Sequence, residues 1–312
     1  MAFFSIFVGL ILLIKGGDWL MKSAVSLSLK LNIPKIVIGM TVVSFATSAP
    51  ELIVSIKSAL SGHPDLALGN VIGSNIANLG LVLGLTIIIS PISVNRSFYM
   101  TDWPMMISAT ALFFFFIFFD QKLSNYEGLI MFALLISFLF FLIFFKKETI
   151  IDEISENESV LSFWLIIYYL FAGGFSLWLG SETLIKGAVS LAQQNGVSER
   201  VISVSIISVG TSIPELSASI VAVINKEKAI SIGNLIGSNI FNLLAVLGIT
   251  SIIAPVNVID TGLLNNDIWW MIGISTLIFP LAYLFKRNVL SKFEGIILLM
   301  IYITFLYPLI SQ

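Results

Sequence analysis

Apolar residues form long uninterrupted runs along this 312-residue chain, separated by short polar turns. These runs are close to the ~17–25 residues that a helix needs to cross a bilayer. Within each run the apolar residues are continuous and do not alternate with polar ones, which favours helices over a β-barrel. The pattern therefore predicts ten transmembrane helices, at residues 3–20, 36–60, 66–92, 103–119, 128–145, 161–184, 201–223, 230–253, 268–285 and 295–310.

The composition agrees with a chain embedded in lipid. Apolar residues make up 57% of the sequence and charged residues 11%, against about 45–50% and about 25% in soluble domains. So few charges do not provide a polar coat for a water-soluble protein of this length. A formal net charge of −2 without a basic patch argues against a nucleic-acid partner, and the lack of cysteine excludes a disulfide scaffold. We therefore expect an all-α integral membrane protein.

The basic residues predict an orientation in the membrane. Eleven of the 16 Lys and Arg residues lie in one set of connecting loops and four in the other, with Lys15 inside the first run. The positive-inside rule places the richer set in the cytoplasm. Because the number of helices is even, both termini are then predicted outside. The expected location is the cell membrane (plasma or inner), with multiple crossings.

Residues 146–160 form the longest polar connection and carry five acidic residues. The segment has no glycine and lacks the Asp-x-Asp spacing of an EF-hand loop, so we interpret it as a solvated cytoplasmic linker. It divides the chain into a first five-helix repeat at residues 1–145 and a second at residues 161–312.

The two halves repeat each other in sequence. A shift of 164 residues aligns Thr47-Ser-Ala-Pro-Glu51 with Thr211-Ser-Ile-Pro-Glu215, and Gly69-Asn-Val-Ile-Gly-Ser-Asn75 with Gly233-Asn-Leu-Ile-Gly-Ser-Asn239. Each half holds five predicted helices, an odd number, so the second half enters the membrane from the opposite side. Inverted repeats are typical of secondary transporters, whose substrate sites lie near the bilayer midplane and are formed by broken helices.

Two acidic residues, Glu51 and Glu215, lie in the middle of apolar runs. A carboxylate there costs several kcal/mol unless it is compensated, so such a residue is usually functional; the alternative is a pair of protonated acids that hold helices together. Pro50 and Pro214 precede these acids and are predicted to break the helices, since proline lacks an N–H group and clashes with the carbonyl four residues earlier. The freed oxygens would be hard ligands suited to Ca²⁺ or Na⁺. The carbonyl oxygens are those of Ala46, Gly210, Ser44, Thr47, Ser208 and Thr211. The hydroxyls of Thr47, Ser48, Thr211 and Ser212 flank the two breaks.

The repeated Gly-Asn-x-x-Gly-Ser-Asn segments open the third and eighth predicted helices. We interpret their glycines as packing residues, because small residues let membrane helices approach closely; these are Gly69, Gly73, Gly233 and Gly237. Ser74 and Asn78 are four residues apart, as are Ser238 and Asn242, so each pair shares one helix face. We expect these two polar faces to point toward the polar site.

Taken together, the paired Thr-Ser-x-Pro-Glu and Gly-Asn-x-x-Gly-Ser-Asn segments resemble the α-repeats of the calcium/cation antiporter superfamily, in particular its prokaryotic Na⁺/Ca²⁺ exchangers. The resemblance covers all ten predicted helices in order and length. It implies alternating access, in which the first and sixth helices shift against the rest. It also implies a Ca²⁺ site at Glu51, Glu215, Thr47 and Thr211. The Na⁺ sites that it implies involve Ser44, Thr47, Ser48, Glu51 and Ser74 in one half, and Ser208, Thr211, Ser212, Glu215 and Ser238 in the other, with Asn78 and Asn242 at the centre.

The sequence departs from this family pattern at three positions. Related prokaryotic proteins often carry Asp at the position of Asn242, and Ala at the positions of Ser44 and Ser208. Members that depend on K⁺ carry an acid at the Asn242 position, so asparagine there argues against K⁺ co-transport and leaves two carboxylates at the centre. The effect of the two added hydroxyls on Na⁺ affinity stays open.

The sequence thus predicts a secondary active antiporter that exchanges Ca²⁺ for Na⁺, without a cofactor. A Ca²⁺/H⁺ antiporter of the same superfamily is the nearest alternative, and a passive cation channel is an alternative of another class. Hydroxyl-rich flanks favour Na⁺ over protons, and the inverted repeat argues against a channel. An enzyme is not expected, because two glutamates without a nucleophile–base pair or a phosphate-binding loop are insufficient for catalysis. The oligomeric state stays open.

Overall fold

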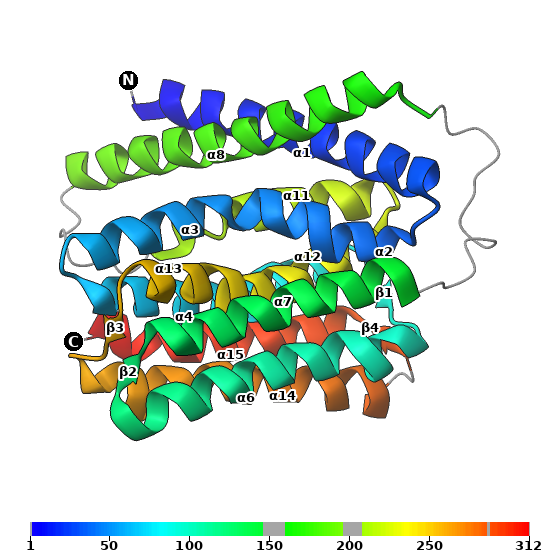
Figure 1. Cartoon of the computed structure of the whole chain (residues 1–312). Coiled ribbons are helices and arrows are strands. Elements are labelled where there is room, and N and C mark those ends of the chain that lie inside the picture. Colours follow the sequence, from blue (N-terminus) through cyan, green and yellow to red (C-terminus); the bar gives the residue numbers. More distant parts are fainter. Residues whose placement is uncertain (1, 146–159, 196–207, 286–287, 312) are drawn as a thin grey trace. The chain divides into compact units, whose positions relative to one another are not determined.

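The computed structural model describes residues 2–145, 160–195, 208–285 and 288–311, and this part of the chain is almost entirely helical (Figure 1). Seven of the described helices are long and apolar enough to cross a membrane, judged by length and composition. The remaining predicted runs contain the helices Ile213–Ile224, Ile268–Pro280 and Lys292–Ser311. The all-α fold is therefore confirmed, and the count of ten crossings stays a prediction.

The helices follow the same order in the two halves of the chain, with π-helical segments (η) between α-helices. In the first half they are α1 (Ala2–Leu31), α2 (Lys35–Ile38), η1 (Gly39–Val43), α3 (Ser44–Leu60), α4 (Pro64–Ala77), η2 (Asn78–Leu83), α5 (Gly84–Ile89), η3 (Phe98–Asp102), α6 (Trp103–Asp120) and α7 (Asn125–Phe145). In the second half they are α8 (Phe163–Gln194), α10 (Ser208–Gly210), α11 (Ile213–Ile224), α12 (Lys228–Phe241), η6 (Asn242–Leu247), α13 (Gly248–Ile253), η7 (Leu263–Asp267), α14 (Ile268–Pro280), η8 (Leu281–Phe285) and α15 (Lys292–Ser311).

Four strands of two residues each were not predicted. Strand β1 (Ile92–Ser93) pairs antiparallel with β4 (Val289–Leu290), and β2 (Lys122–Leu123) pairs antiparallel with β3 (Val256–Asn257). These pairs join ends of helices, and two residues are too short to give a recognisable alternating pattern. Strands β1 and β3 begin 164 residues apart, as do η2 and η6, so the structure repeats at the same offset as the sequence.

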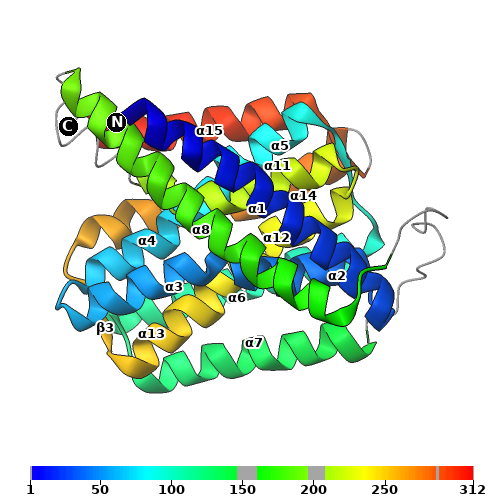
Figure 2. The same cartoon turned by 90° about the horizontal axis from the view of Figure 1, so that it is seen from above.

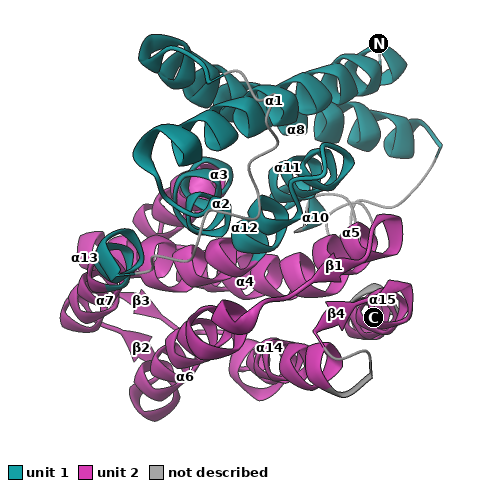
Figure 3. Cartoon of the chain, turned by 90° about the vertical axis from the view of Figure 1, so that its right-hand side faces the viewer, with its two compact units in different colours: residues 1–47, 138–235 teal, residues 48–137, 236–312 magenta. Residues whose placement is uncertain are grey.

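The chain forms two compact units, each of which takes elements from both halves of the sequence (Figure 3). Unit 1 comprises residues 1–47 and 138–235, and unit 2 comprises residues 48–137 and 236–312. The helices α3, α7 and α12 run from one unit into the other. The division at residues 146–160 follows the sequence repeat, whereas the units follow packing; all but Val160 of that linker lies outside the described residues.

In unit 1 the long helices α1 and α8 lie side by side along their length (Figures 1 and 2). A Cβ atom added to Gly16 would lie 2.9 Å from the carbonyl oxygen of Gly173, and one added to Gly173 would lie 2.9 Å from the carbonyl oxygen of Gly16. Such contacts require the absence of a side chain on both helices. Similar contacts recur every seventh residue on each helix, at Gly9 and Gly16 of α1 and at Gly173, Gly180 and Gly187 of α8.

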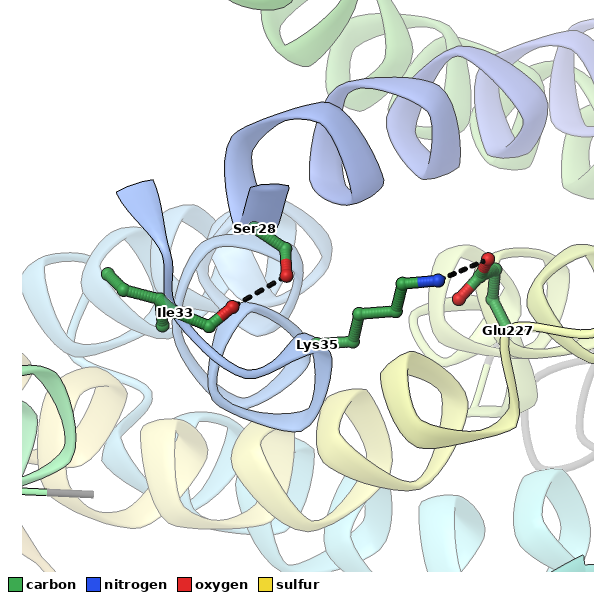
Figure 4. Close-up of polar contacts among 4 residues, drawn as sticks. All are labelled: Ser28, Ile33, Lys35 and Glu227. Atoms are coloured by element: carbon green, nitrogen blue, oxygen red, sulfur yellow. Dashed lines mark hydrogen bonds and ion pairs between the residues drawn. The ribbon is translucent and has the colours of Figure 1, made fainter. Parts of the chain in front are cut away.

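A second close helix pair of unit 1 joins the first half of the chain to the second. A Cβ atom added to Gly39 of η1 would lie 2.5 Å from the carbonyl oxygen of Ile230 in α12. At the beginning of the same pair, Lys35 Nζ lies 3.0 Å from Glu227 Oε1, with both side chains largely buried (Figure 4). Breaking a buried ion pair by removing one partner is costly, so this contact fixes where α2 begins relative to α12.

Unit 2 holds two matching glycine contacts. Gly84 of α5 packs against Gly295 of α15, with 3.1 Å between a Cβ atom on Gly84 and the Gly295 carbonyl oxygen. Gly248 of α13, 164 residues after Gly84, packs in the same way against Gly128 of α7, with 3.2 Å between the corresponding atoms. The last helix of each half is thus held against a short helix that follows a π segment.

Candidate ion-binding site

In the first half, the acidic motif lies within a continuous helix. Helix α3 passes through Pro50 and carries Glu51 in its middle. The prediction of a helix break at Pro50 is therefore wrong. Proline removes only its own donor, so the carbonyl of Ala46 loses one bond while the flanking residues remain α-helical. The irregularity lies upstream instead, in the π segment η1 directly before Ser44.

In the second half, the predicted break is present. Helix α10 ends at Gly210, and α11 begins at Ile213 with Pro214 in its first turn, where a missing N–H group is tolerated. The carbonyl of Gly210, four residues before the proline, accepts a 2.8 Å hydrogen bond from the hydroxyl of Ser181 in α8. Glu215 falls in the first turn of α11, where the helix dipole favours a negative charge.

The two carboxylates are fully removed from solvent, since neither Glu51 nor Glu215 exposes any surface. Glu51 belongs to unit 2 and Glu215 to unit 1. Ionised groups in such surroundings cost several kcal/mol unless cations or hydrogen bonds compensate them. Complete burial at both repeat positions makes these two acids candidates for cation binding.

The hydroxyls of Ser44 and Thr47 are engaged by the protein itself. Ser44 Oγ lies 2.9 Å from the carbonyl oxygens of both Gly39 and Asn234. Thr47 Oγ1 lies 3.2 Å from Asn234 Oδ1 and 3.3 Å from the Ser44 carbonyl oxygen. Both hydroxyls therefore act as donors within unit 1. The hydroxyl of Ser44 thus links η1 to α12.

Four of the other predicted serines are buried as well, namely Ser48, Ser74, Ser212 and Ser238. Among the described residues, no hydrogen-bond partner lies within reach of the Ser212 hydroxyl. Thr211 lies in the turn between α10 and α11. Ser208 begins α10, and its side chain lies outside the described part of the structure.

Asn78 and Asn242 are the first residues of the π segments η2 and η6, and both are fully buried in unit 2. The Asn242 amide donates a 3.1 Å hydrogen bond to Asn75 Oδ1. Within the described residues, the Asn78 amide and Asn242 Oδ1 have no hydrogen-bond partner. Buried polar atoms are usually paired, so these residues are candidates for contact with a water or, through their oxygen atoms, with a cation. Single π-helical turns also occur frequently at functional sites.

Two hydrogen-bonded polar pairs beside the motif acids were not predicted from the sequence. Asn70 Nδ2 lies 3.1 Å from Ser55 Oγ, and Asn234 Nδ2 lies 3.2 Å from Ser219 Oγ. Both asparagines and both serines recur at the offset of 164 residues. This repetition of polar residues in apolar helices was the signal available in the sequence.

Each unit holds some of the predicted site residues. Unit 1 holds Ser44, Thr47, Ser208, Thr211, Ser212 and Glu215, and unit 2 holds Ser48, Glu51, Ser74, Asn78, Ser238 and Asn242. Each unit thus contains one of the two acids together with hydroxyl-bearing residues from both halves of the chain. These groups supply oxygen atoms, the ligands that suit Ca²⁺ and Na⁺.

Comparison with known proteins places this arrangement in a defined class. The model of the sodium/calcium exchanger protein family matches residues 1–144 and 165–310. The chain is 37% identical over 314 residues to CaxA of Alkalimonas amylolytica and 29% identical over 350 residues to the sodium/calcium exchanger MaX1 of Methanosarcina acetivorans, with 98% of each chain covered in both cases. The solved structure of the sodium-calcium exchanger NCX_Mj superposes with a TM-score of 0.80 at 27% identity and covers 97% of both chains.

The fold and these matches define a multi-pass helical membrane protein of the antiporter class, which is a transporter and not an enzyme. The chain belongs to the sodium/calcium exchanger family.

Proposed function

We propose that the chain exchanges Ca²⁺ for Na⁺ across the cell membrane by alternating access. The observation that carries the proposal is the complete burial of Glu51 and Glu215 at equivalent positions of two repeated motifs. Membership of the sodium/calcium exchanger family supports the choice of ions.

In this proposal one Ca²⁺ is bound by the carboxylates of Glu51 and Glu215 and by the carbonyls of Thr47 and Thr211. Na⁺ competes through the same acids and threonines together with Ser44, Ser48 and Ser74 in one half and Ser208, Ser212 and Ser238 in the other. Asn78 and Asn242 lie around a central water or cation. Engagement of the Thr47 and Ser44 hydroxyls by other groups supports carbonyl ligation at these two residues.

Alternating access requires a part of the molecule that shifts as one body. The close backbone contacts between α1 and α8 support these two helices as that part, since helices packed so tightly move together. We also propose that the chain crosses the membrane ten times, that its halves have inverted orientations and that both termini lie outside. These features rest on the hydrophobic pattern and on the distribution of basic residues.

Two alternatives give different ion fluxes. A Ca²⁺/H⁺ antiporter would use the same glutamates to exchange Ca²⁺ for protons, and a passive channel would conduct without a counter-ion. Ser212, whose hydroxyl has no partner among the described residues, favours Na⁺ over protons because a proton needs no additional oxygen ligands.

The exchange is tested with purified protein in proteoliposomes loaded with ²²Na⁺. Addition of external Ca²⁺ should release ²²Na⁺, and external Mg²⁺ at the same concentration should not. Release that is independent of external Ca²⁺ would indicate a channel, and Ca²⁺ entry without ²²Na⁺ release would indicate proton coupling.

We expect the Ser74→Ala and Ser238→Ala variants to weaken the Na⁺ dependence of exchange more than Ca²⁺ binding. Each hydroxyl is proposed to bind Na⁺ and to lie outside the Ca²⁺ ligands. Loss of one neutral ligand should raise the half-saturating Na⁺ concentration roughly fivefold to tenfold. Thr110→Val is the control, because this buried hydroxyl bonds, within the described residues, to its own helix at the Met106 carbonyl. Lower Ca²⁺ affinity with unchanged Na⁺ dependence would reverse the assignment.

Exchange is also expected to be electrogenic and independent of K⁺. With asparagine at positions 78 and 242, the central fixed charge is −2, from Glu51 and Glu215. One Ca²⁺ neutralises this charge, whereas three Na⁺ ions, the number that the family resemblance implies, leave one positive charge to move in each cycle. Moving one charge across 100 mV is worth about 2.3 kcal/mol, so voltage should change the rate.

The measurement for this prediction is the initial Na⁺-driven Ca²⁺ flux at membrane potentials clamped with valinomycin. In separate vesicles at zero potential, K⁺ is replaced by choline, which should leave the flux unchanged. A flux that does not respond to voltage would indicate two Na⁺ per Ca²⁺ or a proton that balances the charge. A requirement for K⁺ would contradict the interpretation of Asn242.

A further inference from the structure

The side-chain amides of Asn234 and Asn70 occupy the same place in the two repeated motifs. Asn234 Nδ2 lies 3.2 Å from the hydroxyl of Ser219, and Asn70 Nδ2 lies 3.1 Å from the hydroxyl of Ser55. Ser219 follows Glu215 by four residues on α11, just as Ser55 follows Glu51 on α3. Residues four apart share one helix face, so each amide contacts the acidic helix one turn beyond its carboxylate.

Asn234 also contacts the motif of the opposite repeat within unit 1. Its Oδ1 lies 3.2 Å from Thr47 Oγ1, and its backbone carbonyl lies 2.9 Å from Ser44 Oγ. One fully buried residue thus bonds on one side to the ligand-bearing start of α3, and on the other to Ser219, one turn from Glu215. A primary amide has both an acceptor and donors, so Asn234 makes this connection without a charge.

The backbone around Asn234 has little freedom to rearrange. Its neighbour Gly233 packs directly on the carbonyl of Ile36, and Gly39 of η1 lies against Ile230. At the beginning of the same helix pair, the buried ion pair of Lys35 and Glu227 holds α2 to the start of α12. The amide therefore projects from a fixed position, and its hydrogen bonds determine how the Thr47 side chain is turned.

We propose that Asn234 is a positioning residue of the ion site, which holds the Thr47 hydroxyl so that Thr47 presents its backbone carbonyl to the bound cation. This inference rests on the proposed function, since it assumes that Thr47 is a cation ligand. In unit 2, Asn70 contacts its own acidic helix, with its amide 3.4 Å from the Glu51 carbonyl oxygen and 3.1 Å from Ser55 Oγ. Neither asparagine is itself a cation ligand.

A double-mutant cycle tests this role, with the equilibrium affinity for ⁴⁵Ca²⁺ of the purified protein in detergent as the readout. Asn234→Leu removes the amide at similar volume, and Thr47→Val removes the hydroxyl but keeps the carbonyl. Each should weaken Ca²⁺ binding by about tenfold, the size expected for a lost buried hydrogen bond. Because both changes remove the same contact, the double variant should be no weaker than the weaker-binding single variant.

Asn70→Leu combined with Thr47→Val is the matched control. Asn70 belongs to the other unit and bonds to Ser55 and Glu51, so its effect should multiply with that of Thr47→Val to about a hundredfold. If Asn234→Leu does not fold, Ser219→Ala replaces it, because this change removes the other end of the connection. Its combination with Thr47→Val should also be non-additive.

Unchanged Ca²⁺ affinity in Asn234→Leu, or effects of Asn234→Leu and Thr47→Val that multiply, would overturn the positioning role. Affinity is measured separately from exchange so that failure of the positioning role and failure of the proposed function give different results. A wild-type protein that binds Ca²⁺ but does not exchange it for Na⁺ contradicts the proposed function while the cycle still decides the role of Asn234. A wild-type protein that binds no Ca²⁺ contradicts both.

Discussion

Replacement of either buried acid by its amide, Glu51→Gln or Glu215→Gln, is expected to abolish Ca²⁺ exchange. Glutamine keeps the size and an oxygen atom of glutamate but removes one of the two charges that neutralise the ion. Since charge count tunes Ca²⁺ affinity strongly, we expect a loss of about a hundredfold or more in each variant. The measurement is the initial rate of Na⁺-driven ⁴⁵Ca²⁺ uptake into proteoliposomes.

The same variants should fold at least as well as the wild type without ions. Each removes a fully buried carboxylate, whose burial costs free energy when no cation is bound. Glu182→Gln is the control, because this acid is partly exposed and pairs with Lys186 one turn further along α8. Near-normal uptake by either variant would contradict the site assignment. A lower unfolding temperature of the ion-free variants would indicate that the acids instead hold helices together.

The second large effect is expected at a pair of equivalent glycines, Gly69 and Gly233. A Cβ atom on Gly233 would collide with the carbonyl of Ile36, whereas one on Gly69 would meet only Leu263 Cδ2, at 3.8 Å. Gly233→Ala should therefore lower the free energy of unfolding by about 1–3 kcal/mol, as overpacking does. Gly69→Ala should raise it by up to about 1 kcal/mol, since alanine favours a helix more than glycine.

Thermal unfolding of the two variants in detergent measures this difference directly. The substitutions are identical and fall at the same place of the same motif, so each serves as the control of the other. Equal shifts in the unfolding temperature would contradict the packing of α2 and η1 against α12. Open space around Gly73, where no described atom lies within 4 Å of an added Cβ, likewise shows that the packing prediction was wrong for that glycine.

The long apolar runs were sufficient to predict the helices, because an apolar segment of this length has few other stable structures in a membrane. The internal repeat predicted the matching positions of Glu51 and Glu215, and the structure buries both completely. The ends of the helices were harder to place. Strand pairs of two residues leave no pattern in the sequence, and they depend on helix ends that lie far apart along the chain.

The effect of a proline also depended on context that the sequence did not provide. Pro50 and Pro214 stand in the same motif, yet α3 continues through the first while α11 begins at the second. In the second half, Ser181 of α8 supplies the hydrogen bond that the proline removes from Gly210, a contact between residues 29 positions apart. The contacts of Asn234 were hidden for the same reason, since its partners Thr47 and Ser219 lie on different helices.

The central claim is that Ca²⁺ moves in exchange for Na⁺. The most direct measurement is ⁴⁵Ca²⁺ uptake into proteoliposomes that contain the wild-type protein, with an outward gradient of Na⁺, K⁺ or H⁺ imposed one at a time at a clamped potential. The account predicts uptake above the equilibrium level with the Na⁺ gradient alone. Uptake driven by the H⁺ gradient but not by Na⁺, or uptake that reaches equilibrium equally fast without any gradient, would contradict it.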